Sequence, residues 1–555
     1  MASAQDGTPK GGAAPPGPSC DEPDPSAWYR DLTGWIGRGG GAIHPSLEAF
    51  DSSSSSRGVR ASEAIAQGEL LIRLPAGLAL DGSNLPVTYP APEADTAAPR
   101  TASPWLRCLA RLLTEEGSEL RDGDADGRLT DFGPYLRSLP RTYDTLLDEA
   151  AWPENAVNRL LGGTALGRMV SEDRRRGVLR QRYGLGVRPY LGHVGVPGEG
   201  DKDEEEGEGG GFEAFRRACA CVSTRGFHLE PDASSRQEEG ATYSGPFLLP
   251  YIDLLNHSTS SPCTTLRRDP ADGAFTMIAE RSLLQGEEVC HAYGTDLTSA
   301  QLLQTFGFVE EGTALRASEG SWDGVNSGTV TPATFSAGEV LKACQSVLGS
   351  TYPSELRTLM ARTGVPDEAW DLPPAHGGRD VLSSGLIPDD VMVAPDVPLS
   401  EELLTLLCLP FLPDDAYAEW KADPCLWTEE VLGDYFLGKL ALRSLVLAIG
   451  SKMEGYPTLR PLECGLGDGG QSGEGDRDWD NRLLARLLNA PHAEEGGGQL
   501  RKRAIYALAV RLEEKRCLNM LKKKLVDLAE ELDEESAGEE KEAGGGDHPT
   551  KKIRL

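Results

Sequence analysis

Apolar residues recur every three or four positions in several segments of the first 310 residues, and this spacing is typical of amphipathic helices. We predict helices at residues 28–36, 104–113, 212–222 and 298–305, and a helical region over residues 132–166 that Pro140 and Pro153 interrupt. The helix at residues 298–305 is expected to present Leu302 and Leu303 to a core.

Between these helices, short runs rich in apolar and β-branched residues predict strands. Residues 57–61 and 65–75 are expected to form a strand pair with a turn at Gly68. Residues 276–279 are expected to form a strand that faces residues 288–292. Helices and strands that mix in this way predict an α+β fold class.

Beyond residue 311 the strand patterns give way to long amphipathic stretches. We predict helices at residues 337–347, 352–361, 401–409, 428–451 and from about 499 to 532. Leucines in the last helix alternate steps of three and four and make one apolar stripe: Leu518, Leu521, Leu525, Leu528 and Leu532. The stripe is expected to be core, although a partner helix could use it.

Length and composition predict more than one domain, because 555 residues exceed the size at which single hydrophobic cores stop growing. We expect a disordered arm at residues 1–27, an α+β domain at 28–312, a helical domain at 325–533 and a charged, disordered tail at 534–555. Within residues 28–312 we expect a disordered loop rich in Glu and Gly at about 196–211.

The formal net charge of −32 argues against a nucleic-acid partner, since phosphate contacts need clustered Lys and Arg. The negative field of the chain would favour basic protein segments as binding partners. Alternatively, the acidic loops only keep the chain in solution. No apolar run approaches the ~20 residues that span a bilayer, so we expect no membrane partner. The eleven cysteines have no zinc-ligand spacing and predict no metal site. We expect a cytoplasmic or nuclear protein, and a plastid location stays open.

Three segments carry the strongest functional signal. They read Pro-Tyr-Ile-Asp-Leu-Leu-Asn-His-Ser at 250–258, Gly-Glu-Glu-Val-Cys-His-Ala-Tyr-Gly at 286–294 and Gln-Leu-Leu-Gln-Thr-Phe-Gly-Phe at 301–308. In this order they resemble the cofactor and catalytic segments of SET-domain methyltransferases. The likeness is greatest to the branch typified by the Rubisco large-subunit lysine methyltransferase, whose members modify non-histone proteins. This resemblance implies a SET β-sheet fold with a helical insertion at about residues 100–245 and a pseudoknot-like active site, followed by an all-α substrate-binding domain.

The resemblance implies catalytic roles for two residues. Tyr293 matches the tyrosine whose hydroxyl lines the methyl-transfer channel, where a neutral phenol can orient an amine lone pair without adding a charge. Asp253 would border the target lysine, where its carboxylate could stabilise the incoming ammonium. A capping or structural role for Asp253 is an equal alternative.

The implied cofactor is S-adenosyl-L-methionine. Arg57 and Gly58 align with the loop that embraces its methionine part, and Arg225 matches the arginine that suits its carboxylate. The other cofactor residues implied are Asn256 and His257, which match the pair that holds the adenine, Phe308, which would pack near that ring, and Tyr293. An asparagine side chain can serve adenine N6 and N7 together, as in base recognition. Core packing is the alternative for Phe308.

The resemblance places His291 and Phe306 in the substrate pocket. Phe306 stands where this family often has Tyr in a Tyr-Gly-Phe triplet. Because that hydroxyl is lost, the number of methyl groups transferred stays open.

We therefore expect a monomeric, S-adenosylmethionine-dependent protein-lysine N-methyltransferase that acts on a non-histone protein. The protein substrate would bear a lysine and could be ribosomal, a translation factor or Rubisco-like. Two alternatives stay open. One is a protein-histidine N-methyltransferase of the same fold, since an imidazole of pKa ~6.5 needs no help with deprotonation. The other is a non-catalytic protein that binds a partner through its C-terminal helices.

Overall fold

The computed structural model describes much of the chain, in two compact units. The described residues are 27–52, 56–90, 99–121, 132–196, 210–229, 244–294, 296–319, 327–348, 390–396, 399–408, 419, 438–459, 479–490 and 497–542. The first unit, here the sheet unit, comprises Met1–Tyr89, Arg100–Pro140 and Arg225–Tyr293. The second, here the helical unit, comprises Pro90–Pro99, Arg141–Thr224 and Gly294–Leu555. The predicted helix at residues 352–361 lies outside the described residues.

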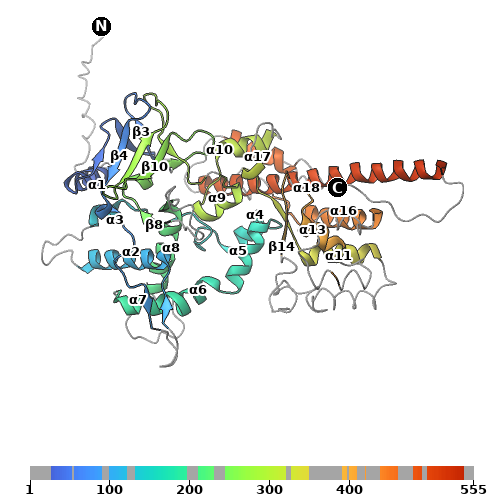
Figure 1. The fold of residues 1–555 in the computed structure, drawn as a ribbon, viewed down its shortest axis with the longest axis horizontal. Coiled ribbons are helices and arrows are strands. Elements are labelled where there is room, and N and C mark those ends of the chain that lie inside the picture. The colour runs from blue at the N-terminus through green and yellow to red at the C-terminus, as the bar shows by residue number, and fades with distance from the viewer. Residues whose placement is uncertain are drawn as a thin grey trace, which may run out of the picture. The chain divides into compact units, whose positions relative to one another are not determined.

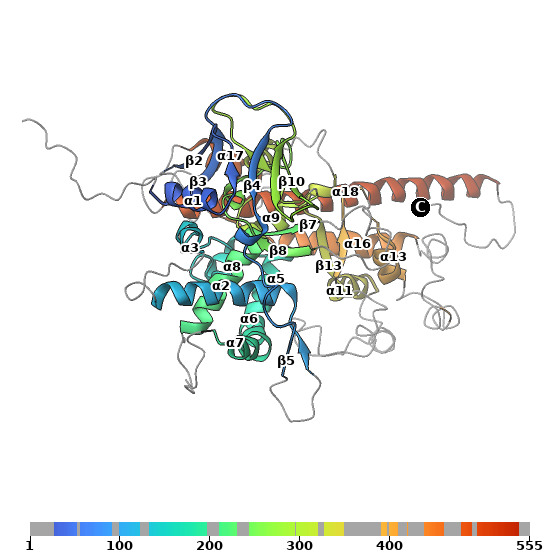
Figure 2. The same ribbon diagram turned by 60° about the vertical axis from the view of Figure 1, so that its left-hand side comes forward.

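Six short strands form the main sheet of the sheet unit (Figures 1 and 2). In spatial order they are β1 (Ala42–Ile43), β4 (Leu70–Leu74), β11 (Phe275–Ala279), β10 (Thr264–Arg268), β12 (Cys290–His291) and β9 (Asn256–His257). β12 pairs in parallel with β10 and with β9, and the other pairs are antiparallel. Side chains of β11 alternate in burial, as expected for a strand with one face on a core.

Two predicted strand pairings are wrong. β3 (Ser56–Ala61) pairs with β2 (Leu47–Ser52), while β4 joins the main sheet, so no strand pair forms across Gly68. Gly68 does make the predicted turn, with φ of +86°. β10 lies between β11 and β12, so β11 does not face residues 288–292. The sequence of β10, Thr-Thr-Leu-Arg-Arg, has one apolar residue and gave no strand signal.

Helices and two further strand pairs complete the sheet unit. These elements are α1 (Ala27–Arg38), α2 (Pro104–Arg121), α3 (Gly133–Ser138), the 3-10 turns η1 (Ala76–Leu78) and η3 (Ile252–Leu254), the pair β5 (Thr88–Tyr89) and β6 (Arg100–Thr101), and the pair β7 (Gly226–Leu229) and β8 (Ser244–Leu248). The predicted helices at residues 28–36 and 104–113 are confirmed. α1 fully buries Leu32 and Ile36, which lie one turn apart.

The helical unit consists mainly of helices (Figure 1). They are α4 (Glu154–Leu160), α5 (Ala165–Arg175), α6 (Val178–Arg182), the π-helix η2 (Tyr183–Val187), α7 (Arg188–Val194), α8 (Gly210–Arg225), α9 (Ser299–Phe306), α10 (Glu311–Glu319), η4 (Ser327–Thr329), α11 (Ala337–Leu348), α13 (Glu401–Cys408), α16 (Gly438–Glu454), α17 (Trp479–Asn489) and α18 (Gly497–Glu542). Arg225, the last residue of α8, belongs to the sheet unit. Helices predicted at residues 212–222, 337–347 and 499–532 are confirmed. Those predicted at 401–409 and 428–451 are confirmed over their described residues, 401–408 and 438–451. The C-terminal part also holds a two-stranded sheet that the sequence did not predict, β13 (Ala333–Ser336) with β14 (Asp390–Val393).

The helix predicted at residues 298–305 is confirmed as α9, and local sequence signals explain both of its ends. Thr298 caps its N-terminus in a capping box with Gln301, and Gly307 ends it in the left-handed region, with φ of +81°. Leu302 and Leu303 are buried, as predicted.

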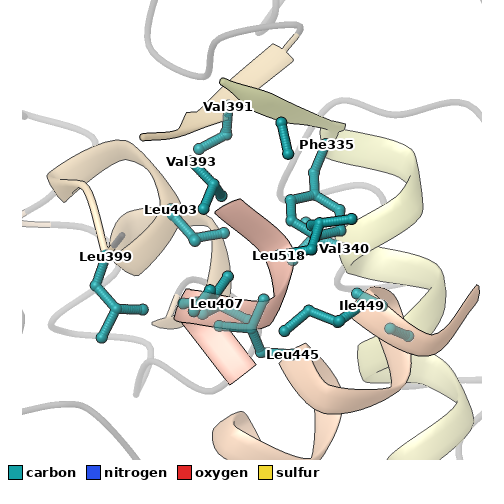
Figure 3. Packing of buried hydrophobic residues seen from close by; sticks show 14 of the residues in the cluster. Phe335, Val340, Val391, Val393, Leu399, Leu403, Leu407, Leu445, Ile449 and Leu518 are labelled. Atoms are coloured by element: carbon teal, nitrogen blue, oxygen red, sulfur yellow. The ribbon is translucent and has the colours of Figure 1, made fainter. Parts of the chain in front are cut away.

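The apolar stripe of α18 is core, as predicted. Leu518, Leu521 and Leu525 are buried, and Leu528 packs against the same cluster. Figure 3 shows Leu518 among side chains from β13, α11, β14, α13 and α16: Phe335, Val340, Val391, Val393, Leu403, Leu407, Leu445 and Ile449. The side chain of Leu532 lies outside those described. Among the described helices, none combines the length and the apolar composition of a membrane-spanning segment.

Two adjacent buried carboxylates on α18 connect it to other parts of the helical unit. Glu513 accepts hydrogen bonds from the Ser299 hydroxyl and the Thr331 backbone N–H, both at 2.8 Å. Glu514 accepts from the Ala165 N–H (2.9 Å) at the start of α5 and from the Tyr456 hydroxyl (2.7 Å). Burial raises the pKa of Glu514 from 4.5 to about 7, although these hydrogen bonds oppose the shift.

Glu514 should therefore make stability depend on pH. Its raised pKa means that the folded state holds a proton that the unfolded state has released, so this contribution is complete below about pH 4.5 and is lost as the pH rises through 7. Relative to Glu514→Gln, the unfolding free energy of the wild type should fall by about 3 kcal/mol between acidic and mildly alkaline pH. Urea denaturation of both proteins across this range measures the difference, and parallel pH profiles would contradict it.

Candidate functional site

Three chain segments that are distant in sequence are joined by backbone hydrogen bonds in the sheet unit. On one side, the Gly286 N–H donates to Ala61 O (2.7 Å) and the Val289 N–H donates to Val59 O (2.7 Å) of β3. On the other side, β12 pairs with β9, which places Cys290 beside Asn256. The predicted site residues on β3, on β9 and at residues 291–293 thus come together.

The Asn256 amide connects all three segments. Its Nδ2 donates to Arg57 O (2.8 Å) and to Glu288 Oε1 (2.7 Å). Because both amide hydrogens are used, only Oδ1 can meet a further ligand, as an acceptor. The predicted contact of this side chain with adenine stays a prediction.

Gly58 is needed for this close packing. A Cβ atom at Gly58 would lie 2.7 Å from Phe50 Cζ, 2.8 Å from Asn256 Nδ2 and 2.9 Å from Glu288 Oε1. The glycine therefore makes room for the Asn256–Glu288 contact. Its predicted role toward the cofactor stays a prediction.

Gly58→Ala should lower the free energy of unfolding by about 2 kcal/mol, because three neighbours must move to admit one methyl group. Gly37→Ala is the matched control, since a Cβ at that position in α1 meets nothing within 4 Å. The control should stabilise the protein by roughly 0.5–1 kcal/mol. Urea denaturation of both variants measures the effects, and a neutral Gly58→Ala would refute the packing role.

His257 and Tyr293 are joined through the histidine ring. The Tyr293 backbone N–H donates to His257 Nδ1 (3.0 Å), and His257 Nε2 lies 2.9 Å from Thr259 Oγ1. Because Nδ1 accepts, the proton of the neutral ring is on Nε2, which donates to Thr259. The two rings lie 5.1 Å apart, so His257 fixes both the backbone and the ring environment of Tyr293.

The Tyr293 hydroxyl has a defined orientation. It donates to Leu255 O at 2.9 Å, and its oxygen keeps lone pairs that can accept. Burial raises the pKa of this phenol above its ordinary value, with a smaller opposing effect from Arg225. Tyr293 is therefore a neutral acceptor at physiological pH.

Asp253 is buried and held by two partners. Its Oδ2 accepts from the Tyr135 hydroxyl (3.0 Å) and from Arg225 Nη1 (3.3 Å), while Arg225 Nη1 also donates to Asp253 O (2.8 Å). Burial raises the pKa of Asp253, although the charge of Arg225 and these hydrogen bonds oppose it. Asp253 Oδ1 is buried and has no hydrogen-bond partner among the described residues. A structural role for Asp253 is thus visible, and its catalytic role stays a prediction.

The turn that precedes Asp253 and Asn256 has a strained backbone. Tyr251 has φ of +72° and ψ of −41°, a left-handed conformation that residues with a Cβ rarely adopt. Its fully buried side chain holds it there, since its hydroxyl donates to Tyr29 Oη at 3.2 Å while Tyr29 donates to Leu47 O. Tyr251 immediately precedes η3, which contains Asp253.

Of the remaining predicted residues, Arg57 and His291 lie in the sheet unit, and Phe306 and Phe308 lie in the helical unit. Arg57 stacks on Trp28, with Cζ 4.3 Å from the ring centre. The centre of the His291 ring is 5.9 Å from that of Phe227 and 6.4 Å from that of Tyr293. Burial lowers the pKa of His291, so its ring is neutral near pH 7.

Phe306 and Phe308 belong to the helical unit, where their rings lie 6.2 Å apart. Phe308 packs against a hydrophobic core of that unit. This is the core packing held as its alternative role, and the adenine contact stays a prediction.

Several residues of the site were missed by sequence analysis. Glu288 lies inside the Gly-Glu-Glu motif, and its position one residue after the turn glutamate was a usable signal. Tyr251 precedes Ile-Asp-Leu in the same motif that contains Asp253. Tyr135 lies 118 residues from Asp253, and no local pattern connects the two.

A family model described as SET domain matches residues 56–294, which include β3, η3, β9, β12 and Tyr293. This chain contains a SET domain. No curated protein matches this sequence significantly.

Solved structures show the same fold beyond the SET domain. The structure of Rubisco LSMT bound to AdoMet superposes with a TM-score of 0.53 at 16% sequence identity, covering 92% of this chain and 94% of that chain. The SET domain of LSMT bound to lysine and AdoHcy gives a TM-score of 0.54 at 14% identity, with the same coverage. At such identities these structures are similar in fold, and the likeness extends over both units of the SET-domain protein.

Proposed function

We propose that this protein is an S-adenosylmethionine-dependent protein-lysine N-methyltransferase that acts on a non-histone protein. The observation that carries the proposal is the placement of Tyr293. Its phenol is neutral, is anchored to Leu255 O, and lies beside His257 within a SET domain. Solved structures of similar fold hold AdoMet, and one holds sinefungin and monomethyllysine.

The residues present fit S-adenosylmethionine. Asn256 Oδ1 is an acceptor that suits an adenine amino group, because both Nδ2 hydrogens are already used. Arg225 carries a positive charge that suits the carboxylate of the methionine part. Asp253 Oδ1, buried without a partner in the described part of the chain, offers an acceptor to an ammonium group.

The main chemical demand is an unprotonated amine. A lysine of pKa ~10.4 is neutral about one time in a thousand near pH 7.4, which corresponds to a cost of roughly 4 kcal/mol. Bound S-adenosylmethionine supplies the electrophilic methyl group and a sulfonium charge, and a cation about 4 Å from an ammonium raises its energy by roughly 4 kcal/mol at an effective dielectric of about 20. This protein therefore needs no strong base of its own.

The role that remains for Tyr293 is to orient the substrate amine. Because its proton points to Leu255 O, its oxygen can accept an N–H hydrogen bond from the amine and aim the lone pair away from itself. A neutral phenol does this without a charge that must be desolvated. His257 supports it by holding the Tyr293 backbone at 3.0 Å.

The test uses full-length protein, S-adenosylmethionine with a tritiated methyl group, and a lysate from cells with inhibited methylation. Hydrolysis of the labelled proteins and chromatography of the amino acids should give label in methyllysines. Label in methylhistidine would select the histidine alternative. No transfer and no calorimetric binding of S-adenosylmethionine would support the non-catalytic alternative.

A further inference from the structure

Exposed arginines are concentrated on three consecutive helices of the helical unit, in a chain whose net charge is −32. Residues 165–196 contain seven arginines and two carboxylates. Five of these arginines, here the arginine surface, are exposed along α5, α6 and α7: Arg175, Arg176, Arg180, Arg182 and Arg188. Figure 1 shows α5, α6 and α7 following one another along the chain.

A packed platform supports the arginine surface. The Tyr183 ring of η2 lies 5.5 Å from Phe212 and 4.9 Å from Phe215 of α8, and Phe215 is buried. Arg180 lies over Phe212, with Cζ 4.5 Å from the ring centre. α6, η2 and α7 follow one another without a break, so one continuous helical segment carries Arg180, Arg182 and Arg188.

Arginines outnumber carboxylates on the segment that carries this surface, seven to two within residues 165–196. Glu172 pairs with both Arg175 and Arg176, and Asp173 is exposed beside them. Arg182 makes no ion pair within the described residues. Exposed guanidinium groups lose side-chain entropy when they are ordered, so an excess of them on one surface fits a function in binding better than one in stability.

We propose that the arginine surface binds an Asp- and Glu-rich segment of the protein substrate, a proposal that rests on the function proposed above. Guanidinium groups match carboxylates in bidentate geometry. Leu185, which lies between Arg182 and Arg188 in sequence, is 65% exposed and offers an apolar contact to a peptide side chain. The substrate class is thus a lysine protein with an acidic segment outside the reacting site.

A nucleic acid fits this surface less well than an acidic peptide does. A long polyanion that runs past the arginine surface meets the negative field of a chain with 87 carboxylates and 55 Lys and Arg. A short acidic segment stays within the positive region. Net charge alone predicts a preference for basic partners. At the arginine surface the local charge is positive, so the preferred partner there is acidic.

The test measures binding of a fluorescein-labelled oligoglutamate peptide to the full chain by fluorescence anisotropy at physiological ionic strength. In one variant, Arg176, Arg182 and Arg188 are replaced by Gln. In the matched control, Lys522, Lys523 and Lys524 are replaced by Gln, which removes the same charge from exposed positions of α18. The arginine variant should bind about tenfold more weakly and the lysine control within about twofold of the wild type.

Unchanged binding by the arginine variant, or an equal loss in the lysine control, would overturn the proposal. So would tighter binding of an oligouridylate of equal length, which would indicate a nucleic-acid surface. If the triple variant does not fold, Arg182→Gln alone must still weaken binding about threefold, since Arg182 has no ion pair to lose in the described structure.

The peptide assay requires no methyl transfer, and this separates the two proposals. If the peptide does not bind but methyl transfer to lysate proteins is intact, only the proposal about the arginine surface is contradicted. Intact peptide binding without any transfer contradicts the methyltransferase proposal alone.

Discussion

Tyr293→Phe is expected to lower the methyl-transfer rate about a hundredfold, because it removes the oxygen that orients the amine while it keeps the ring. Affinity for S-adenosylmethionine should stay within about threefold of the wild type, since the ring still packs beside His257. Single-turnover transfer to lysate proteins and calorimetry measure the two effects separately.

Tyr456→Phe is the control for Tyr293→Phe. It also removes one buried tyrosine hydroxyl that donates a hydrogen bond, in this case to Glu514 at 2.7 Å. Each variant should lose about 1 kcal/mol of stability, and the methyl-transfer rate should fall only in Tyr293→Phe. Full residual turnover in Tyr293→Phe would remove this hydroxyl from the mechanism.

Asp253→Ala is expected to lower the free energy of unfolding by about 3 kcal/mol. It leaves the guanidinium of Arg225, which is only 18% exposed, without its carboxylate and removes the acceptor of the Tyr135 hydroxyl. Urea denaturation measures this loss.

Asp253→Asn separates structure from chemistry at the same position. The amide oxygen can accept from Tyr135 and Arg225, so stability should fall by only about 1 kcal/mol. If Asp253 stabilises an incoming ammonium, transfer should still fall in Asp253→Asn, with the larger effect on KM. Near wild-type kinetics together with a stable fold would limit Asp253 to a structural role.

Local patterns in the sequence predict much of the fold. Thr298 and Gln301 form a capping box, and Leu518, Leu521 and Leu525 lie on one side of a helix, so α9 and the core face of α18 follow from neighbours in sequence. Strand pairing does not follow in this way. β10 carries one leucine among polar residues, and its place between β11 and β12 is set by contacts across the sheet.

The same distinction applies to the site. Asn256, His257 and Tyr293 are found because their motifs are short and ordered, and the structure brings them together. Tyr135 could not be found, since its contact with Asp253 spans 118 residues. The positive φ of Tyr251 has no local signal either, because a tyrosine is among the residues least expected there.

The central claim is that β3, the η3–β9 turn and the segment from Glu288 to Tyr293 close around one S-adenosylmethionine molecule. Hydrogen–deuterium exchange with and without S-adenosylhomocysteine tests this claim most directly. We predict slower exchange in peptides that cover residues 56–61, 252–258 and 288–293, with Asn256→Ala abolishing the slowing in all three. Slowing confined to other peptides, or none at saturating ligand, would contradict the account.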